Sequence, residues 1–273
     1  MGRVNRRIAT VVIATTVTAL SGCLATTQQE VQLGADYAAQ INRQLPIIAD
    51  PEVTRYINLL GDSLSNVADD RSLTWHFYVV DQPDINAFAV PGGYVYVNRG
   101  LIERAENLSQ LAGVMGHEIG HVVKRHSVKQ MRDQERANGL AAGICVVAPG
   151  ICGSEAGSAG LQVLGAGVFA KFSRDDEAQA DQQGVLYTTK AHIDPHGIPN
   201  MFRILLAERK SNPDAVSAFF ASHPVEESRI ADTQAQIAKL DPAMLRNVTV
   251  DSPGFQQFKR RLMSLPRTPR VKK

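Results

Sequence analysis

Two histidines and a glutamate stand close together in the sequence as His117-Glu118-x-x-His121. Residues four apart on a helix point in the same direction, so His117 and His121 can share one zinc ion. Glu118 lies about 100° around the helix from His117, near enough to take a proton from an attacking water without binding the metal. The motif therefore predicts hydrolysis assisted by one zinc ion (Zn2+) per chain, with Glu118 as the general base.

The surrounding residues predict the helix that must carry this motif. Asn107 can cap its start, and apolar residues then recur on one face. These positions are Leu108, Leu111, Ala112, Met115, Ile119, Val122 and Val123. Both histidines fall on the opposite face, about 180° and 220° from Leu108. Core histidines would share the apolar face, so this separation favours metal binding. His126 follows the helix and is expected to contact its last carbonyl groups.

The first 22 residues predict a signal peptide. Three arginines precede an apolar stretch of 13 residues at positions 8–20, which is too short to span a bilayer. Leu-Ser-Gly then precedes Cys23, and this resembles a bacterial lipobox, in which the cysteine is lipidated. The alternative is an ordinary cleaved signal peptide. Leu24 in place of aspartate favours the outer membrane by resemblance to such lipoproteins. We therefore expect a periplasmic protein anchored to the outer membrane by lipidated Cys23.

Charge divides the mature chain into two parts. Residues 23–245 carry 18 basic and 26 acidic side chains, and their length suits one domain with a substantial core. Residues 246–273 carry eight basic side chains, one acidic side chain and three prolines. This segment predicts a flexible tail, either solvated or in contact with anionic lipid headgroups. The chain has no aromatic–basic platform and no nucleic-acid-binding motif, so no nucleic-acid partner is expected.

The elements before the motif helix are also readable. Apolar spacing predicts helices at residues 28–45 and 52–67. Residues 73–80 alternate and are rich in β-formers, which predicts a strand. Residues 86–98 predict a hairpin that runs directly into the zinc-binding helix. The expected α+β fold is mostly helical with a small antiparallel sheet beside that helix. An edge strand of this sheet can pair with an extended peptide substrate.

Residues 137–172 are rich in glycine and alanine and almost uncharged. Neither half reaches the roughly 20 apolar residues of a membrane span. The segment is therefore either a helical hairpin packed on the domain or a loop that touches substrate or membrane. Cys145 and Cys152 lie here, and an oxidising compartment favours a disulfide between them over two free thiols.

A catalytic zinc ion needs a third protein ligand and one open position for water. Ser173 can cap a helix with an acidic first turn, and Glu177 and Asp181 share one face of that helix. This pair is a weak signal by itself, because acidic helix starts are common and usually solvated.

Several motifs occur in order between about residues 30 and 240. They are Asn86-Ala87-Phe88-Ala89-Val90-Pro91-Gly92-Gly93, His117-Glu118-x-x-His121, Glu177-x-x-x-Asp181, and Ser222-His223-Pro224 with Arg229. Together they resemble the HtpX and CAAX-prenyl-endopeptidase family of zinc metalloproteases, in its soluble periplasmic lipoprotein branch that includes BepA and LoiP. The resemblance implies a zincin-like (gluzincin) metallopeptidase domain.

The resemblance also implies roles for individual residues. Glu177 becomes the third zinc ligand, and Asp181 a carboxylate that orients a ligand histidine or helps to protonate the leaving amine. His223 lies over the zinc, where it either stabilises the oxyanion or fills the open position; a capping or surface role is the alternative. Arg229 holds this loop through Asp181 or Glu177. Residues 86–89, together with Arg229, form the expected substrate-binding set.

The expected function is that of a lipid-anchored zinc endopeptidase. The resemblance indicates polypeptide substrates, namely misfolded or unassembled outer-membrane proteins or their assembly machinery. One rival is a periplasmic chaperone or assembly factor with a latched or structural zinc site, and another is a zinc hydrolase of peptidoglycan cross-links. Glu118 favours an enzyme, because a scaffold would not need it. The edge strand favours polypeptide over peptidoglycan.

Overall fold

The computed structural model of the 273-residue chain describes residues 26–68, 71–134, 171–225 and 227–268. Cys23, Cys145 and Cys152 lie outside these ranges, as does nearly all of the Gly/Ala-rich segment. The lipid anchor and the disulfide therefore stay predictions. Among the described residues, no helix is both long enough and apolar enough to cross a membrane.

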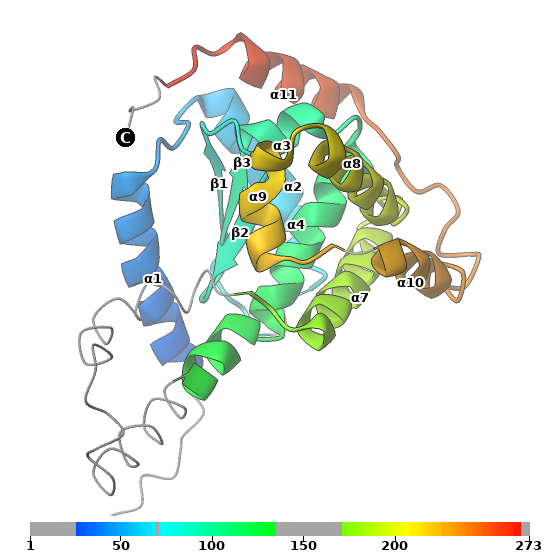
Figure 1. The fold of residues 1–273 in the computed structure, drawn as a ribbon, viewed down its shortest axis with the longest axis horizontal. Coiled ribbons are helices and arrows are strands. Elements are labelled where there is room, and N and C mark those ends of the chain that lie inside the picture. The colour runs from blue at the N-terminus through cyan, green and yellow to red at the C-terminus, as the bar shows by residue number, and fades with distance from the viewer. Residues whose placement is uncertain (1–25, 69–70, 135–170, 226, 269–273) are drawn as a thin grey trace, which may run out of the picture.

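Helices dominate the described part of the chain, and one small sheet lies among them (Figure 1). The elements are α1 (Thr27–Gln44), α2 (Pro51–Ser65), β1 (His76–Val80), β2 (Ala87–Val90), β3 (Tyr94–Asn98), α3 (Arg99–Arg104), α4 (Leu108–Val123), α7 (Arg174–Lys190), α8 (Gly197–Ser211), α9 (Pro213–Ser222), α10 (Glu227–Ile237) and α11 (Pro253–Ser264). The expected α+β class is confirmed, and so are the two early helices, now α1 and α2. The expected zinc-binding helix is α4.

The sheet has the strand order β1-β3-β2. β2 and β3 form the expected hairpin, with Ala87 opposite Val97. β1, however, pairs with β3 in parallel, with His76 opposite Tyr94. The expectation of a purely antiparallel sheet is therefore wrong for β1. Alternation identifies a strand but not the direction of its partner, and here β3 inserts between β1 and β2, which are consecutive in the chain.

The sheet separates two apolar clusters. α1 covers one face, where Ile41 packs with Val80, Val90 and Tyr96. Side chains of the other face, such as Val95, join the main core together with α2 and α4. This division follows from the period of two along each strand. The sheet therefore supports α4 from one side and leaves the opposite side of α4 for the metal-binding histidines.

The C-terminal segment is not the flexible tail that its charge and prolines predict. Residues 253–264 form α11, which packs on α2. Phe258 is 3% exposed and stacks on Tyr56 with ring centroids 4.5 Å apart. Phe255, Phe258 and Leu262 are buried because their spacing puts them on one helix face, while the basic residues around them face outward. α11 is therefore part of the folded domain.

Candidate metal centre

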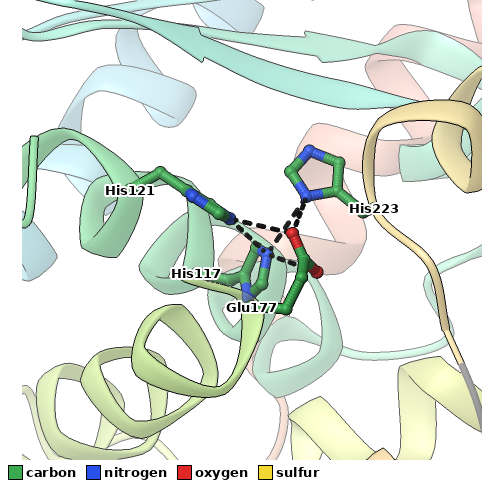
Figure 2. A group of neighbouring side chains, drawn as sticks. All are labelled: His117, His121, Glu177 and His223. Carbon is green, nitrogen blue, oxygen red and sulfur yellow. Dashed lines mark hydrogen bonds and ion pairs between the residues drawn. The ribbon is translucent and has the colours of Figure 1, made fainter. Parts of the chain in front are cut away.

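The centre forms where α4 packs against α7 (Figure 2). Gly120 permits the close approach of the two helices, because a Cβ atom there would lie only 3.1 Å from the Ala180 carbonyl oxygen. His117 and His121, one turn apart on α4, therefore reach Glu177 of α7. The glycines that flank the His-Glu motif thus have a structural reason as well.

α7 begins where the sequence predicts. The Ser173 hydroxyl accepts a hydrogen bond from the Asp176 N–H at 3.1 Å, and the Asp176 carboxylate contacts the Ser173 N–H at 3.4 Å. This capping box fixes the first turn of the helix. Glu177, the next residue, is thereby directed at α4.

Four side chains bring one possible ligand atom each to a common point. His117 Nε2 and His121 Nε2 lie 3.0 Å apart, and Glu177 Oε1 lies 3.4 Å from His121 Nε2. His223 Nδ1 completes the group, 2.9 Å from Glu177 Oε1 and 3.4 Å from His117 Nε2. Zinc–nitrogen bonds of about 2.0–2.1 Å in a tetrahedron place the ligand atoms about 3.3 Å apart. The four atoms therefore match the size of a tetrahedral zinc site.

The outer nitrogen of each α4 histidine faces a further side chain. His117 Nδ1 lies 2.9 Å from Asp181 Oδ1, and because an ionised carboxylate only accepts hydrogen bonds, His117 carries its proton there. His121 Nδ1 lies 2.9 Å from His126 Nδ1. When His121 donates that bond, two bare lone pairs face each other across 3.0 Å at the centre. A cation between them removes the repulsion, so this donor set fits a metal ion. Asp181 lies behind His117, which suits orientation of that ligand rather than protonation of a leaving amine.

Arg229 of α10 lies behind the cluster and binds both of its carboxylates. The guanidinium donates to the two oxygens of Asp181 at 2.6 and 2.8 Å and to Oε2 of Glu177. It also donates to the Pro224 carbonyl at 2.9 Å, next to His223. Arg229 is only 8% exposed, so its assignment to substrate binding is wrong. The side chain instead fixes the carboxylates and the turn that follows α9.

Glu118 is a buried carboxylate near the open side of the cluster. Its Oε1 atom has no hydrogen-bond partner among the described residues and lies 3.6 Å from His223 Nε2. A buried oxygen without a partner costs free energy, and such groups are usually explained by a chemical role or by a water. The arrangement suits a base that receives its proton from a water molecule.

Burial and charge shift the pKa values of the cluster in the metal-free protein. Burial lowers the pKa of His121 well below its usual value. Burial also opposes a charge on His223, but the carboxylates of Glu118 and Glu177 outweigh this effect and raise the pKa of His223. Burial disfavours the Glu177 anion as well, yet the charge on His223 and hydrogen bonds from His121 and His223 hold the pKa of Glu177 well below its usual value. Without a metal, His223 therefore supplies positive charge to the centre.

Phe172 covers the centre from the residues just before α7. Its ring stacks on His121 with centroids 4.0 Å apart and lies 5.4 Å from the His223 ring. Its N–H donates to the Ser222 carbonyl at 3.1 Å, which ties it to the turn that carries His223. The conformation is therefore closed, with side chains at all four corners of the tetrahedron and an aromatic ring beside them.

The expected substrate-binding strand is β2, beside α4. The hydrogen bond from the Asn98 N–H to the Asn86 carbonyl at 2.9 Å makes these two residues a bonded pair. Bonded pairs alternate with pairs whose backbone groups face outward, so Ala87 and Ala89 present theirs to the edge away from β3. The side chains of Ala87 and Ala89 are buried in the core, whereas Phe88 packs on the opposite face. Only the backbone edge is thus available to a peptide.

His126 occupies a position that the sequence did not predict. The expected contact with the last carbonyls of α4 is wrong, because the chain turns at Arg125 (φ 59°) and places His126 against His121. His126 is 2% exposed, and burial lowers its pKa. A left-handed arginine is set by tertiary contacts rather than by local preference, so no local signal could have predicted this turn.

A profile of peptidase family M48 matches residues 51–237 of this chain. The match includes α4, α7 and the turn with His223, and therefore all four side chains of the cluster.

Curated relatives extend the likeness beyond the profile. The chain is 34% identical over 228 residues to the beta-barrel assembly-enhancing protease of Escherichia coli K12, an alignment covering 80% of this chain and 46% of that protein. The protein of the same name in Yersinia pestis is 30% identical over 256 residues, covering 90% of this chain and 50% of that protein. The mitochondrial metalloendopeptidase OMA1 of Schizosaccharomyces pombe is 26% identical over 212 residues, covering 76% of this chain and 60% of that protein. The chain spans about half the length of the beta-barrel assembly-enhancing proteases that it matches.

Proposed function

Because this chain belongs to peptidase family M48, we propose that it is a zinc-dependent endopeptidase acting on polypeptides of the bacterial envelope. One observation carries the proposal: the buried ligand atoms of His117, His121 and Glu177 fit a zinc ion beside the unpartnered carboxylate of Glu118. Imidazole nitrogen and carboxylate oxygen are ligands that zinc accepts in catalytic sites.

The side chains of the centre divide the chemistry among them. When bound, zinc polarises the scissile carbonyl and lowers the pKa of an attacking water to about 7. Glu118 takes the proton of this water and passes it to the leaving nitrogen. Asp181 accepts from His117 and so holds the imidazole with Nε2 directed at the centre. Arg229 fixes Asp181 and Glu177 in the geometry that this requires.

His223 acts in this proposal as a latch. Its Nδ1 atom lies within 3.4 Å of His117 Nε2 and so takes the corner that a water needs for attack. Its Nε2 atom lies 3.6 Å from Glu118, which blocks the base as well. Movement of the turn around His223 frees both. A role of the same histidine in stabilising the oxyanion is the second candidate, and its alanine variant separates the two.

Substrate is proposed to bind in extended form along β2. The backbone groups of Ala87 and Ala89 face the free edge, where a peptide can add as another strand. The Oδ1 atom of Asn86 is buried and has no hydrogen-bond partner among the described residues, so it can accept from a substrate N–H. Extended binding requires an unfolded segment and favours misfolded or unassembled proteins as substrates.

The names of the bacterial relatives favour a site of action in the envelope. Both are called beta-barrel assembly-enhancing proteases, which suggests outer-membrane proteins or their assembly machinery as substrates. A periplasmic location with an anchor at Cys23 is consistent with that role. The alternative, a chaperone or assembly factor with a structural zinc, gives no reason for the buried, unpartnered carboxylate of Glu118.

Cleavage of a panel of unfolded proteins tests the proposal. The panel contains an unfolded outer-membrane β-barrel and an unfolded soluble protein, each incubated with wild type and with Glu118→Gln, with and without a zinc chelator. We expect cleavage by wild type alone and only without chelator. The matched control Glu52→Gln, at an exposed position on α2, should cleave like wild type. Cleavage that survives both the chelator and Glu118→Gln contradicts the proposal.

A further inference from the structure

His126 is a buried imidazole that has no part in the chemistry described so far. We propose that His126 is a positioning residue, which holds the ligand His121 with its Nε2 atom directed at the metal. This inference rests on the proposed metal centre and adds to it a side chain that does not itself bind the metal.

The geometry defines which of the two rings donates. His121 Nδ1 and His126 Nδ1 lie 2.9 Å apart, and the rings meet edge-on at 76°. A neutral imidazole that binds a metal through Nε2 carries its only proton on Nδ1. His121 is therefore the donor, and His126 accepts with the lone pair of its Nδ1 atom. Among the described residues, no other acceptor is hydrogen-bonded to His121 Nδ1.

The second nitrogen of His126 extends the connection to α7. His126 Nε2 carries the proton in this arrangement and lies 3.7 Å from Asp176 Oδ1. Asp176 is itself fixed by the Ser173 hydroxyl at 2.6 Å and by Lys129 at 3.3 Å. The series from His121 through His126 to Asp176 thus links the end of α4 to the first turn of α7. Glu177, another proposed ligand, is the next residue of that turn.

The two ligand histidines of α4 are therefore held differently. His117 donates to a carboxylate, Asp181, whereas His121 donates to a neutral ring. Phe172 stacks on the face of His121 and cannot replace an acceptor at its edge. Outer partners of ligand histidines fix both the tautomer and the ring orientation, and their loss typically weakens metal binding by about 10–100-fold.

Three substitutions of His126 separate an acceptor from mere packing. His126→Asn places an amide oxygen near the position of Nδ1. His126→Gln carries the same amide one methylene further out, and His126→Phe keeps a ring without an acceptor. The zinc dissociation constant of each full-length variant is measured by competition with a chelator. We expect increases of about 10–100-fold for the phenylalanine and glutamine variants, but at most about threefold for asparagine.

Thermal unfolding of the metal-free proteins accompanies these measurements. If the phenylalanine variant does not fold, the pair of amide variants still decides. A zinc dissociation constant within about twofold of wild type for folded His126→Phe or His126→Gln overturns the inference, because a lost outer partner should cost far more. Equal weakening by all three variants also overturns it, since packing alone would then explain the loss. Absence of zinc binding by wild type overturns the proposed function instead, and this inference with it.

Discussion

The Nδ1 atom of His223 lies 2.9 Å from the Oε1 atom of Glu177, at the fourth corner of the proposed zinc site. His223 follows α9 with an extended backbone (φ −120°, ψ 90°), and Pro224 after it disfavours a helical conformation. A short turn rather than a helix therefore carries the side chain that closes the site. Opening the site requires only a movement of this turn, while the ligands on α4 and α7 stay in place.

His223→Ala should raise the rate at which exposed, unfolded substrates are cleaved, because the substitution frees the corner that the water needs. Steady-state proteolysis at matched zinc occupancy measures this effect. A loss of about 10²–10³ in turnover would instead identify His223 as an oxyanion donor. A rate within about a factor of two of wild type would contradict both roles, since it lies far below the usual effect of such a donor.

Arg229→Met should lower the free energy of unfolding of the metal-free protein by about 3–5 kcal/mol, because it leaves two buried carboxylates without their cation. Those carboxylates are Asp181 and Glu177, both bound by the guanidinium. Urea denaturation followed by circular dichroism measures the change. Arg203→Met, on the exposed side of α8, serves as the control and should stay within about 0.5 kcal/mol of wild type. Equal effects of the two substitutions would refute the importance of this buried pair.

Phe258→Ala should destabilise the protein by about 3–5 kcal/mol, because the ring is buried against Tyr56. Gln257→Ala, exposed on the same helix, should cost less than about 0.5 kcal/mol. Both values come from the same urea denaturation experiment. Should the two substitutions prove equally harmless, α11 would be the mobile tail that its sequence suggests rather than part of the domain.

The metal-free protein should show a pH dependence that belongs to His223. The carboxylates of Glu118 and Glu177 raise its pKa despite burial, so its contribution to stability is complete below the unfolded value of about 6.5 and is lost as the pH rises through the raised folded value. The difference in unfolding free energy between wild type and His223→Gln should therefore shrink above about pH 6.5. Saturating zinc should reverse this trend, because zinc competes with protons for imidazole. A difference that does not change with pH would contradict the raised pKa.

The sequence predicts local features of this protein well. The spacing of His117 and His121 places both on one side of α4, and the caps Asn107 and Ser173 begin their helices as expected. Such features depend on residues a few positions apart. The approach of Glu177 depends instead on the packing of α7 on α4, and only the resemblance to a family indicated it. The match to peptidase family M48 confirms that resemblance.

Features that depend on the path of the chain could not be predicted in this way. The parallel pairing of β1 follows from the insertion of β3 between β1 and β2. The place of His126 follows from the turn at Arg125. α11 carries a clear apolar face, but the basic residues around Phe258 and Leu262 outweighed it in the interpretation of the sequence.

Zinc content and proteolysis, measured on the same samples of wild type, Glu118→Gln and Glu177→Ala, test the central claim most directly. The proposed roles are a base for Glu118 and a ligand for Glu177. We predict about one zinc ion per chain in wild type and Glu118→Gln, little or none in Glu177→Ala, and cleavage by wild type alone. Unchanged zinc in Glu177→Ala, or full cleavage by Glu118→Gln, would contradict the account.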